Sequence, residues 1–190
     1  MKGAGFESVL ELAATATDVD AARALADLHG GTLYADERDI PGLPFRALVT
    51  LVTDDLSSVS PIADVGLYLV CRRTIKAGSA TVLGLFPLVH HPELTHRQAD
   101  DHWRDVHAPL ALKHHAFMTH YTQLSVVHTL AGMPLDGMAL CGFASLKDLR
   151  ERFYSEPDSR GVIAADVQTF ADTRRSPRRL IVSERRYGPS

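Results

Sequence analysis

The spacing of apolar residues in the first 76 positions changes several times between the period of a strand and that of a helix. Residues 6–14 predict a strand. Thr17 is then placed to cap a helix that ends at Gly30 and Gly31. The helix is predicted because apolar residues recur at helical spacing at Val19, Ala22, Leu25 and Leu28. Strands are predicted at 31–36, 45–52 and 65–72, and a weak helix near 56–63. The order of elements is approximately βαββ(α)β.

A similar pattern begins again after the Gly/Ser-containing break at residues 76–79. A strand at 80–88 is followed by a helix whose Thr95 and Gln98 match a capping box. Pro109 is expected to interrupt this helix and leave a second helical segment that reaches residue 116. Further elements are strands at 119–128 and 138–143, a helix opened by Ser145, a helical piece to about 170, and a strand at 179–187. This second order is βαββαβ.

Both halves therefore predict an α+β fold of the dimeric α+β barrel type, built from two ferredoxin-like modules. The boundaries are 1–76 for a degenerate module and 77–190 for the second. Each would be an antiparallel sheet with helices on one face, so the other apolar face needs a cover. The cover would be the other module, as an internal pseudo-dimer, or a second chain in a homodimer. We favour the internal pairing because two similar half-chains exist.

Composition narrows the class of protein. The 190 residues are 45% hydrophobic and 23% charged, with a net charge of -3. This balance is typical of a globular protein and lacks the basic excess expected for a nucleic-acid partner. The N-terminal apolar stretch is broken by Glu7 and Glu11, so we expect neither a signal peptide nor a membrane span. Cys71 and Cys141 lie in predicted strands, which favours a reducing, cytoplasmic location.

The chemistry-bearing residues concentrate in one region, because nine of the ten histidines lie between residues 90 and 128. Imidazoles exchange protons near neutral pH, and they also bind metals. The pairs His91/His96 and His102/His107 are each five residues apart, which is a poor spacing for one helical face, and no HExxH motif is present. We therefore predict no metal site.

Trp103 and His107 are four residues apart and should share a helical face. His107 would lie at a helix C-terminus before Pro109, where the helix dipole favours an imidazolium that donates a proton, or where the ring merely caps the helix. On the strand at 119–128, alternate residues Tyr121, Gln123 and Ser125 make one face polar. This polar row predicts either a ligand pocket or an exposed edge strand.

The segment HWRDVHAPL at residues 102–110, followed by Tyr121 on a strand, resembles the EthD-type members of the dimeric α+β barrel superfamily. The resemblance extends over roughly residues 80–187 and includes 85–91 and 142–149. It implies a ferredoxin-like fold with a pocket between paired sheets, and it matches His107 and Tyr121 to the motif histidine and the pocket tyrosine. The family commonly has Arg or Lys after its first strand, whereas this chain has His90 and His91.

Proteins of this family include decarboxylases and dehydratases of aromatic polyketides, and related barrels include isomerases, cyclases and monooxygenases. The resemblance therefore implies a cofactor-free lyase or isomerase that acts by proton transfer on a hydrophobic, oxygenated small molecule. His107 would be the acid or base, and Tyr121 would donate to a developing oxyanion. The expected substrate-binding residues are Trp103, His114, Met118, Gln123, Phe86 and His90. The alternatives are a non-catalytic binding protein and a haem-dependent monooxygenase.

Overall fold

The eight strands that the structure describes form one closed, antiparallel β-barrel. A computed structural model describes residues 8–38 and 40–188. Around the barrel the order is β1-β3-β2-β8-β5-β7-β6-β4. The strands are β1 (Ser8–Ala16), β2 (Thr32–Ala35), β3 (Ala47–Leu51), β4 (Gly66–Lys76), β5 (Val82–Leu88), β6 (Met118–Gly132), β7 (Gly137–Phe143) and β8 (Leu180–Arg186). The predicted strand at 6–14 begins outside the described residues.

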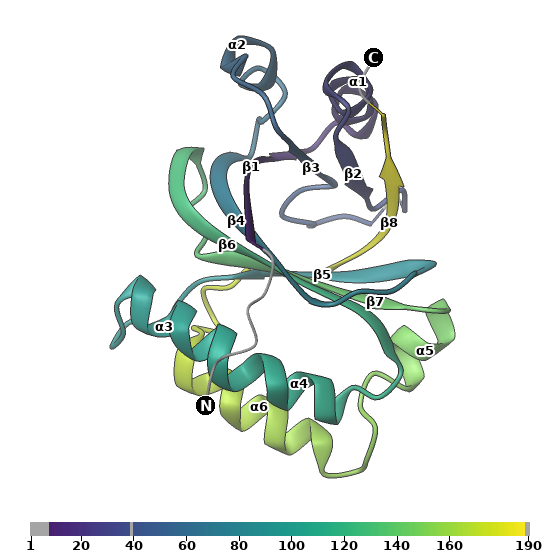
Figure 1. Cartoon of the computed structure of the whole chain (residues 1–190), viewed down its shortest axis with the longest axis vertical. Coiled ribbons are helices and arrows are strands. Elements are labelled where there is room, and N and C mark those ends of the chain that lie inside the picture. The colour runs from purple at the N-terminus through teal and green to yellow at the C-terminus, as the bar shows by residue number, and fades with distance from the viewer. Residues whose placement is uncertain (1–7, 39, 189–190) are drawn as a thin grey trace.

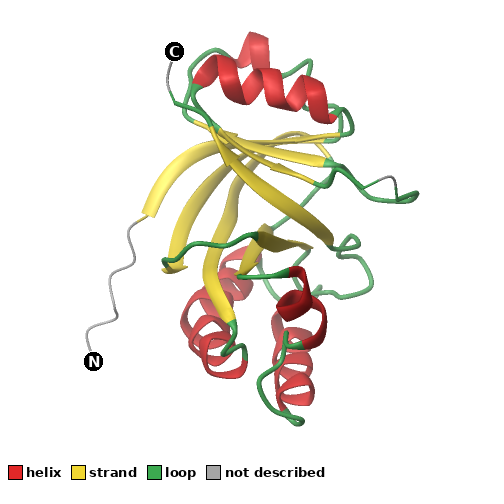
Figure 2. Ribbon diagram, turned by 90° about the vertical axis from the view of Figure 1, so that its right-hand side faces the viewer, coloured by secondary structure: helices red, strands yellow, loops and turns green. Residues whose placement is uncertain are grey.

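Helices cover two opposite sides of the barrel (Figures 1 and 2). They are α1 (Val19–His29), α2 (Leu56–Val59), α3 (His96–His102), the π-helical turn η1 (Trp103–His107), α4 (Ala108–His114), α5 (Leu146–Glu151) and α6 (Ser159–Phe170). Helix α1 packs outside β2 and β3, whereas α3, η1, α4 and α6 form a layer on the other side. No helix among the described residues is long and apolar enough to cross a membrane.

The prediction of two ferredoxin-like modules, each with helices on one face of its own sheet, is wrong. Strand β2 pairs with β8 and β4 pairs with β6, so the strands of both halves close into a single barrel. Inward-facing side chains from both halves, among them Leu48, Val70, Leu85 and Leu140, form one core. The local pattern predicts strands but not the partners of edge strands, and closure gives every edge a hydrogen-bonding partner.

The ends of α1 follow from local chemistry, with one correction to the predicted cap. Asp18, not Thr17, is the N-cap, and its carboxylate accepts hydrogen bonds from the amides of Asp20 and Ala21. Gly30 ends the helix in the left-handed conformation, at φ 67°. The predicted capping box of α3 is confirmed, because Thr95 and Gln98 make both reciprocal hydrogen bonds.

Pro109 does not interrupt the helix as predicted. The chain passes from α3 through the π-turn η1 into α4, and the amide of Ala108 donates to the carbonyl of Trp103, five residues earlier. Pro109 directly follows the π-turn, and the path stays helical although Pro109 has no N–H to donate. His107 therefore lies inside a continuous helical path and not at a helix C-terminus. The π-turn keeps Trp103 and His107 buried on the same side.

Candidate functional site

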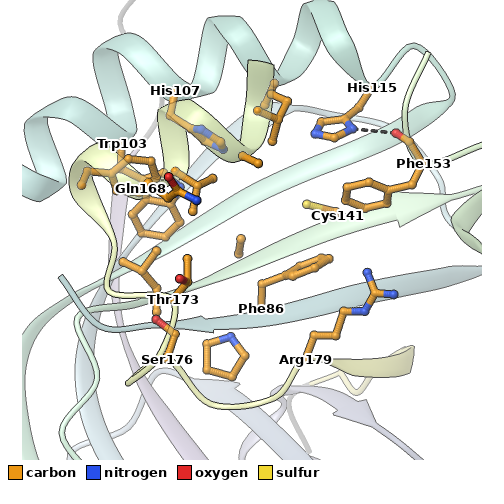
Figure 3. Close-up of a pocket in the computed structure, with 18 of the residues that line it drawn as sticks. Phe86, Trp103, His107, His115, Cys141, Phe153, Gln168, Thr173, Ser176 and Arg179 are labelled. Atoms are coloured by element: carbon orange, nitrogen blue, oxygen red, sulfur yellow. Dashed lines mark hydrogen bonds between the residues drawn. The ribbon is translucent and has the colours of Figure 1, made fainter. Parts of the chain in front are cut away.

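A cavity of about 440 Å³ lies between the helical layer and the outer face of β5, β6 and β7 (Figure 3). The resemblance implied a pocket between paired sheets, but this pocket lies outside the barrel, under η1, α4 and α6. Most of its wall is apolar or aromatic: Phe86, Pro87, Leu88, Trp103, Ala111, Ala139, Cys141, Phe153, Ile163, Ala164, Val167 and Phe170. Polar groups reach it from His107, His115, Tyr121, Tyr154, Gln168, Thr173, Ser176 and Arg179.

The structure brings four of the eight predicted site residues into this pocket: Phe86, Trp103, His107 and Tyr121. The other four lie elsewhere. His114 binds Ser159 through Nδ1 at 2.9 Å, which ties α4 to α6. Met118 is buried in the core beneath the pocket.

Gln123 and His90 also lie outside the pocket. The Gln123 amide lies behind the pocket wall and donates to the carbonyl of Trp103 at 2.9 Å. His90 lies beside Asp136, whose carboxylate accepts its backbone amide at 2.8 Å. That carboxylate also accepts Nδ1 of His96 at 2.9 Å. Among the residues described, no group of three or more His, Cys, Asp or Glu side chains is arranged to hold a metal ion.

His107 is held by a carboxylate that the sequence analysis did not identify. Its Nδ1 lies 2.7 Å from one oxygen of Asp166 on α6, and the other oxygen lies 2.8 Å from Nε2 of His102. Burial raises the pKa of Asp166, but the hydrogen bonds from His107 and His102 outweigh it and hold that pKa below its usual value. Asp166 is therefore ionised at neutral pH. Because Nδ1 is engaged, Nε2 is the nitrogen of His107 left for chemistry in the pocket.

His115, and not its predicted neighbour His114, is the second imidazole of the pocket wall. Its Nδ1 lies 2.6 Å from the backbone carbonyl of Phe153. A carbonyl only accepts hydrogen bonds, so Nδ1 carries the proton and Nε2 of the neutral ring has a free lone pair. Burial lowers the pKa of His115, although the bond to Phe153 opposes the shift, and the charge of nearby His107 lowers it further. The neutral ring is thus favoured.

Tyr121 is fully buried at the back of the pocket in a hydrogen-bond network. Its hydroxyl oxygen accepts from Nε1 of Trp103 at 3.1 Å and from Nε2 of Gln123 at 3.0 Å. Burial raises the pKa of Tyr121 above its ordinary value, which keeps the phenol protonated. Both lone pairs of the oxygen are used, and no described residue accepts its proton. The network therefore leaves a hydroxyl hydrogen free to be donated.

The polar row on β6 belongs neither to an exposed edge nor wholly to the pocket. Strand β6 lies between β4 and β7, and only Tyr121 of the row lines the cavity. Gln123 accepts from Arg73 at 3.2 Å, and Ser125 donates to Asp100 at 2.7 Å. Protein partners under α3 therefore satisfy this part of the row.

Cys141 contributes bulk to the wall and not a nucleophile. Burial raises the pKa of its thiol to about 12. The thiolate, which is the reactive form, is therefore nearly absent at neutral pH.

At the opposite side of the pocket, the guanidinium of Arg179 lies 5.8 Å from the ring centre of Phe86.

Comparison with known proteins identifies the family of this region. Residues 91–174 match the model of the EthD domain. This part of the chain is an EthD domain. The resemblance predicted from the HWRDVHAPL segment is thus confirmed.

Two solved structures resemble the whole chain. One is described as an anthrone oxidase-like protein, with 12% identity, a TM-score of 0.57, and coverage of 97% of this chain and 94% of the other. The second is described as a putative monooxygenase from Lactobacillus acidophilus NCFM, with 8% identity, a TM-score of 0.48, and coverage of 94% and 93%. The first likeness supports the fold. No curated protein matches the sequence.

The EthD domain supplies most of the chemistry of the pocket. His107, His115 and Tyr121 lie within it, and so does Asp166. Phe86 on β5 and the loop that carries Ser176 and Arg179 flank the EthD domain in sequence and complete the opposite wall.

Proposed function

We propose that the EthD domain binds a hydrophobic, oxygenated aromatic molecule and transfers protons on it, as a cofactor-free lyase or isomerase. The observation that carries this proposal is the pair of imidazoles on one apolar wall. His107 is fixed by Asp166, and His115 is fixed by the carbonyl of Phe153. Each ring has Nε2 available for exchange of a proton. The Nδ1 of His107 faces a carboxylate, whereas the Nδ1 of His115 faces a backbone carbonyl.

The cavity wall supports the substrate class. Aromatic and aliphatic side chains surround a volume of about 440 Å³, which lies in the range of small-molecule sites. The few polar groups lie at separate points, with Tyr121 at the back and Ser176 and Arg179 on the opposite side. The rings of an aromatic molecule would pack against the apolar side chains, and oxygen atoms at its edge would bind the polar groups.

The proton transfer proceeds in two steps. Neutral His115 accepts a proton from the substrate at Nε2, because burial lowers its pKa and holds it unprotonated. Negative charge that develops on a substrate oxygen is stabilised by the hydroxyl of Tyr121, whose own oxygen is polarised by Trp103 and Gln123. His107, which enters the step as an imidazolium, then returns a proton from Nε2 while the carboxylate of Asp166 holds the ring in place. Proton exchange with water afterwards restores His107 and His115 to their starting states.

A carrier that only sequesters the same kind of molecule is the second candidate, since the apolar wall suits binding as well as turnover. A haem-dependent monooxygenase, the third, would give a Soret band when haem is added to the purified protein. Oxidation by O2, the activity suggested by the name of the anthrone oxidase-like structure, would begin with the same loss of a proton to His115. Oxygen consumption measured with an electrode separates oxidation from isomerisation or elimination.

The test is turnover of hydroxylated anthrones and related polyketide-like phenols, followed by absorbance and mass spectrometry with and without O2. His107→Ala and His115→Gln should each lower kcat/KM by about 10² or more, with ligand affinity changed much less. His128→Gln is the matched control, because His128 is exposed on β6 outside the pocket. Tight binding that neither substitution weakens, together with no turnover, would favour the carrier.

A further inference from the structure

The interior of the barrel is apolar at one end and polar at the other. Inward-facing Leu48, Leu124 and Val182 belong to the packed core. Further along the same strands, the inward positions become polar because side chains alternate between the two faces. The polar inward positions are Glu11, Thr32, Thr50, Arg72, Thr74, His120, Thr122, Glu184 and Arg186.

This polar end encloses a second cavity of about 490 Å³, separate from the pocket under the helices. It is lined by Glu11, Thr32, Tyr34, Arg72, Thr74, Ala77, Gly78, His120, Thr122 and Arg186. Polar groups inside a barrel lose their hydration unless protein, water or a ligand replaces it. The volume is within the range of small-molecule sites.

The protein itself fixes part of this wall. The Arg72 guanidinium binds Glu11 through Nε and donates from Nη2 to Thr50 at 2.9 Å. Its Nη1 lies 3.4 Å from the hydroxyl oxygen of Tyr34, near the limit of a hydrogen bond. These contacts hold the guanidinium in one place with N–H capacity remaining on Nη1. The wall is thus preorganised before any ligand enters.

Other polar groups on this wall have no protein partner. Neither hydroxyl of Thr32 and Thr74 makes a hydrogen bond to a described residue, and both line the cavity. Thr122 shares a 2.9 Å contact with Nε2 of His120. Hydroxyl groups both donate and accept, so these threonines, which have no protein partner, suit a molecule that also does both.

Each guanidinium of the wall already has a carboxylate partner. Arg72 pairs with Glu11, and Nε of Arg186 lies 2.6 Å from Glu184. An anion that entered would approach the carboxylate of Glu11 and two guanidiniums that already have carboxylate partners. A neutral ligand meets no such penalty.

We propose that the polar end of the barrel is a second ligand site that takes a small, neutral molecule with several hydroxyl groups. It is independent of the proton-transfer pocket. Its occupant contacts the hydroxyls of Thr32, Thr74 and Thr122 and the free Nη1 edge of Arg72.

The test is two-dimensional NMR of the full chain, titrated separately with myo-inositol as the neutral probe and malate as the anionic probe. Saturable shifts should appear at Thr74 and Thr122 with myo-inositol, with a Kd in the range of about 1–10 mM. Thr74→Val and Thr32→Val should each weaken this binding about fivefold, the equivalent of one lost hydrogen bond. Thr81→Val is the matched control, because Thr81 is exposed and lines neither cavity.

Three outcomes would overturn the proposal. One is the absence of saturation below about 100 mM myo-inositol, which would leave the cavity to water. Another is equal binding by wild type and both cavity-wall threonine variants. The third is tighter binding of malate than of myo-inositol. Unfolding curves of each variant verify that lost binding is not lost folding.

Discussion

Gly137 on β7 lies directly beneath the indole of Trp103, and we expect Gly137→Ala to displace that ring. A Cβ atom at position 137 would lie 2.4 Å from Cζ3 and 2.9 Å from Cη2 of Trp103. Ordinary carbon contacts are about 3.5–4.0 Å, so the ring has to move by roughly 1 Å. The carbonyl oxygen of Leu124, at 3.2 Å from the same Cβ, limits escape on the other side.

The expected cost has three contributions. Displacement of Trp103 breaks its Nε1 hydrogen bond to Tyr121, worth about 1 kcal/mol. Overpacking of the core adds about 1–3 kcal/mol. Loss of glycine's freedom in the unfolded chain offsets about 0.4–1 kcal/mol of this. The free energy of unfolding should therefore fall by about 1–3 kcal/mol.

Urea unfolding followed by tryptophan fluorescence measures this effect directly, because Trp103 is the only tryptophan. Its emission should also shift in the folded Gly137→Ala protein, since the indole leaves its bond to Tyr121. Gly161→Ala is the matched control. Gly161 is exposed on α6 with nothing within 4 Å of its Cβ position, so alanine should stabilise the helix by about 0.5–1 kcal/mol.

A double-mutant cycle isolates the contact with the indole. In a Trp103→Phe background, Gly137→Ala should cost less, because the outer indole carbons are gone, with a coupling energy of about 1–2 kcal/mol by circular dichroism. A Gly137→Ala protein as stable as wild type, with unchanged emission, would refute this account of the pocket's back wall.

Three further predictions concern the pocket. Asp166→Asn should reduce turnover through mispositioned His107, and imidazole NMR should show an altered Nδ1 signal for His107 even without a substrate. His115 has a native pKa below its usual 6.5, so the unfolded chain binds its proton first as pH falls. The free energy of unfolding should then decrease from about pH 7 to pH 5, less steeply in His115→Asn. Cys141 should resist iodoacetamide at pH 8 until the protein unfolds, and labelling in the native state would contradict its raised pKa.

Local sequence rules predicted individual helices and strands better than they predicted which strands pair to close the barrel. The capping box at Thr95 and the shared side of Trp103 and His107 depend on residues three and four apart, which a sequence displays directly. The closure of the barrel depends on β2 meeting β8, whose paired residues Thr32 and Arg186 are far apart in the chain. No local pattern records such a pairing.

The same limit explains which site residues were missed. Asp166 reaches His107 across 59 positions of sequence. One signal was present, because Asp166 lies at helical spacing between buried Ile163 and Phe170, and an acid on an apolar face needs a partner. His114 and His115 are adjacent, and α4 ends between them. The position at which α4 ends determines that His115, and not His114, faces the pocket.

The polar row on β6 was interpreted as either a pocket face or an exposed edge strand, whereas the strand borders two cavities. Tyr121 points outward to the pocket under the helices, and Thr122 points inward to the polar end of the barrel. Strand β4 repeats this arrangement, since Arg72 lines the barrel cavity and Arg73 binds Gln123 beneath the helical layer. A strand between two polar environments loses the hydrophobic alternation that normally distinguishes inside from outside. The loss of that alternation on two neighbouring strands is therefore a sequence signal for polar sites on both sides of one wall.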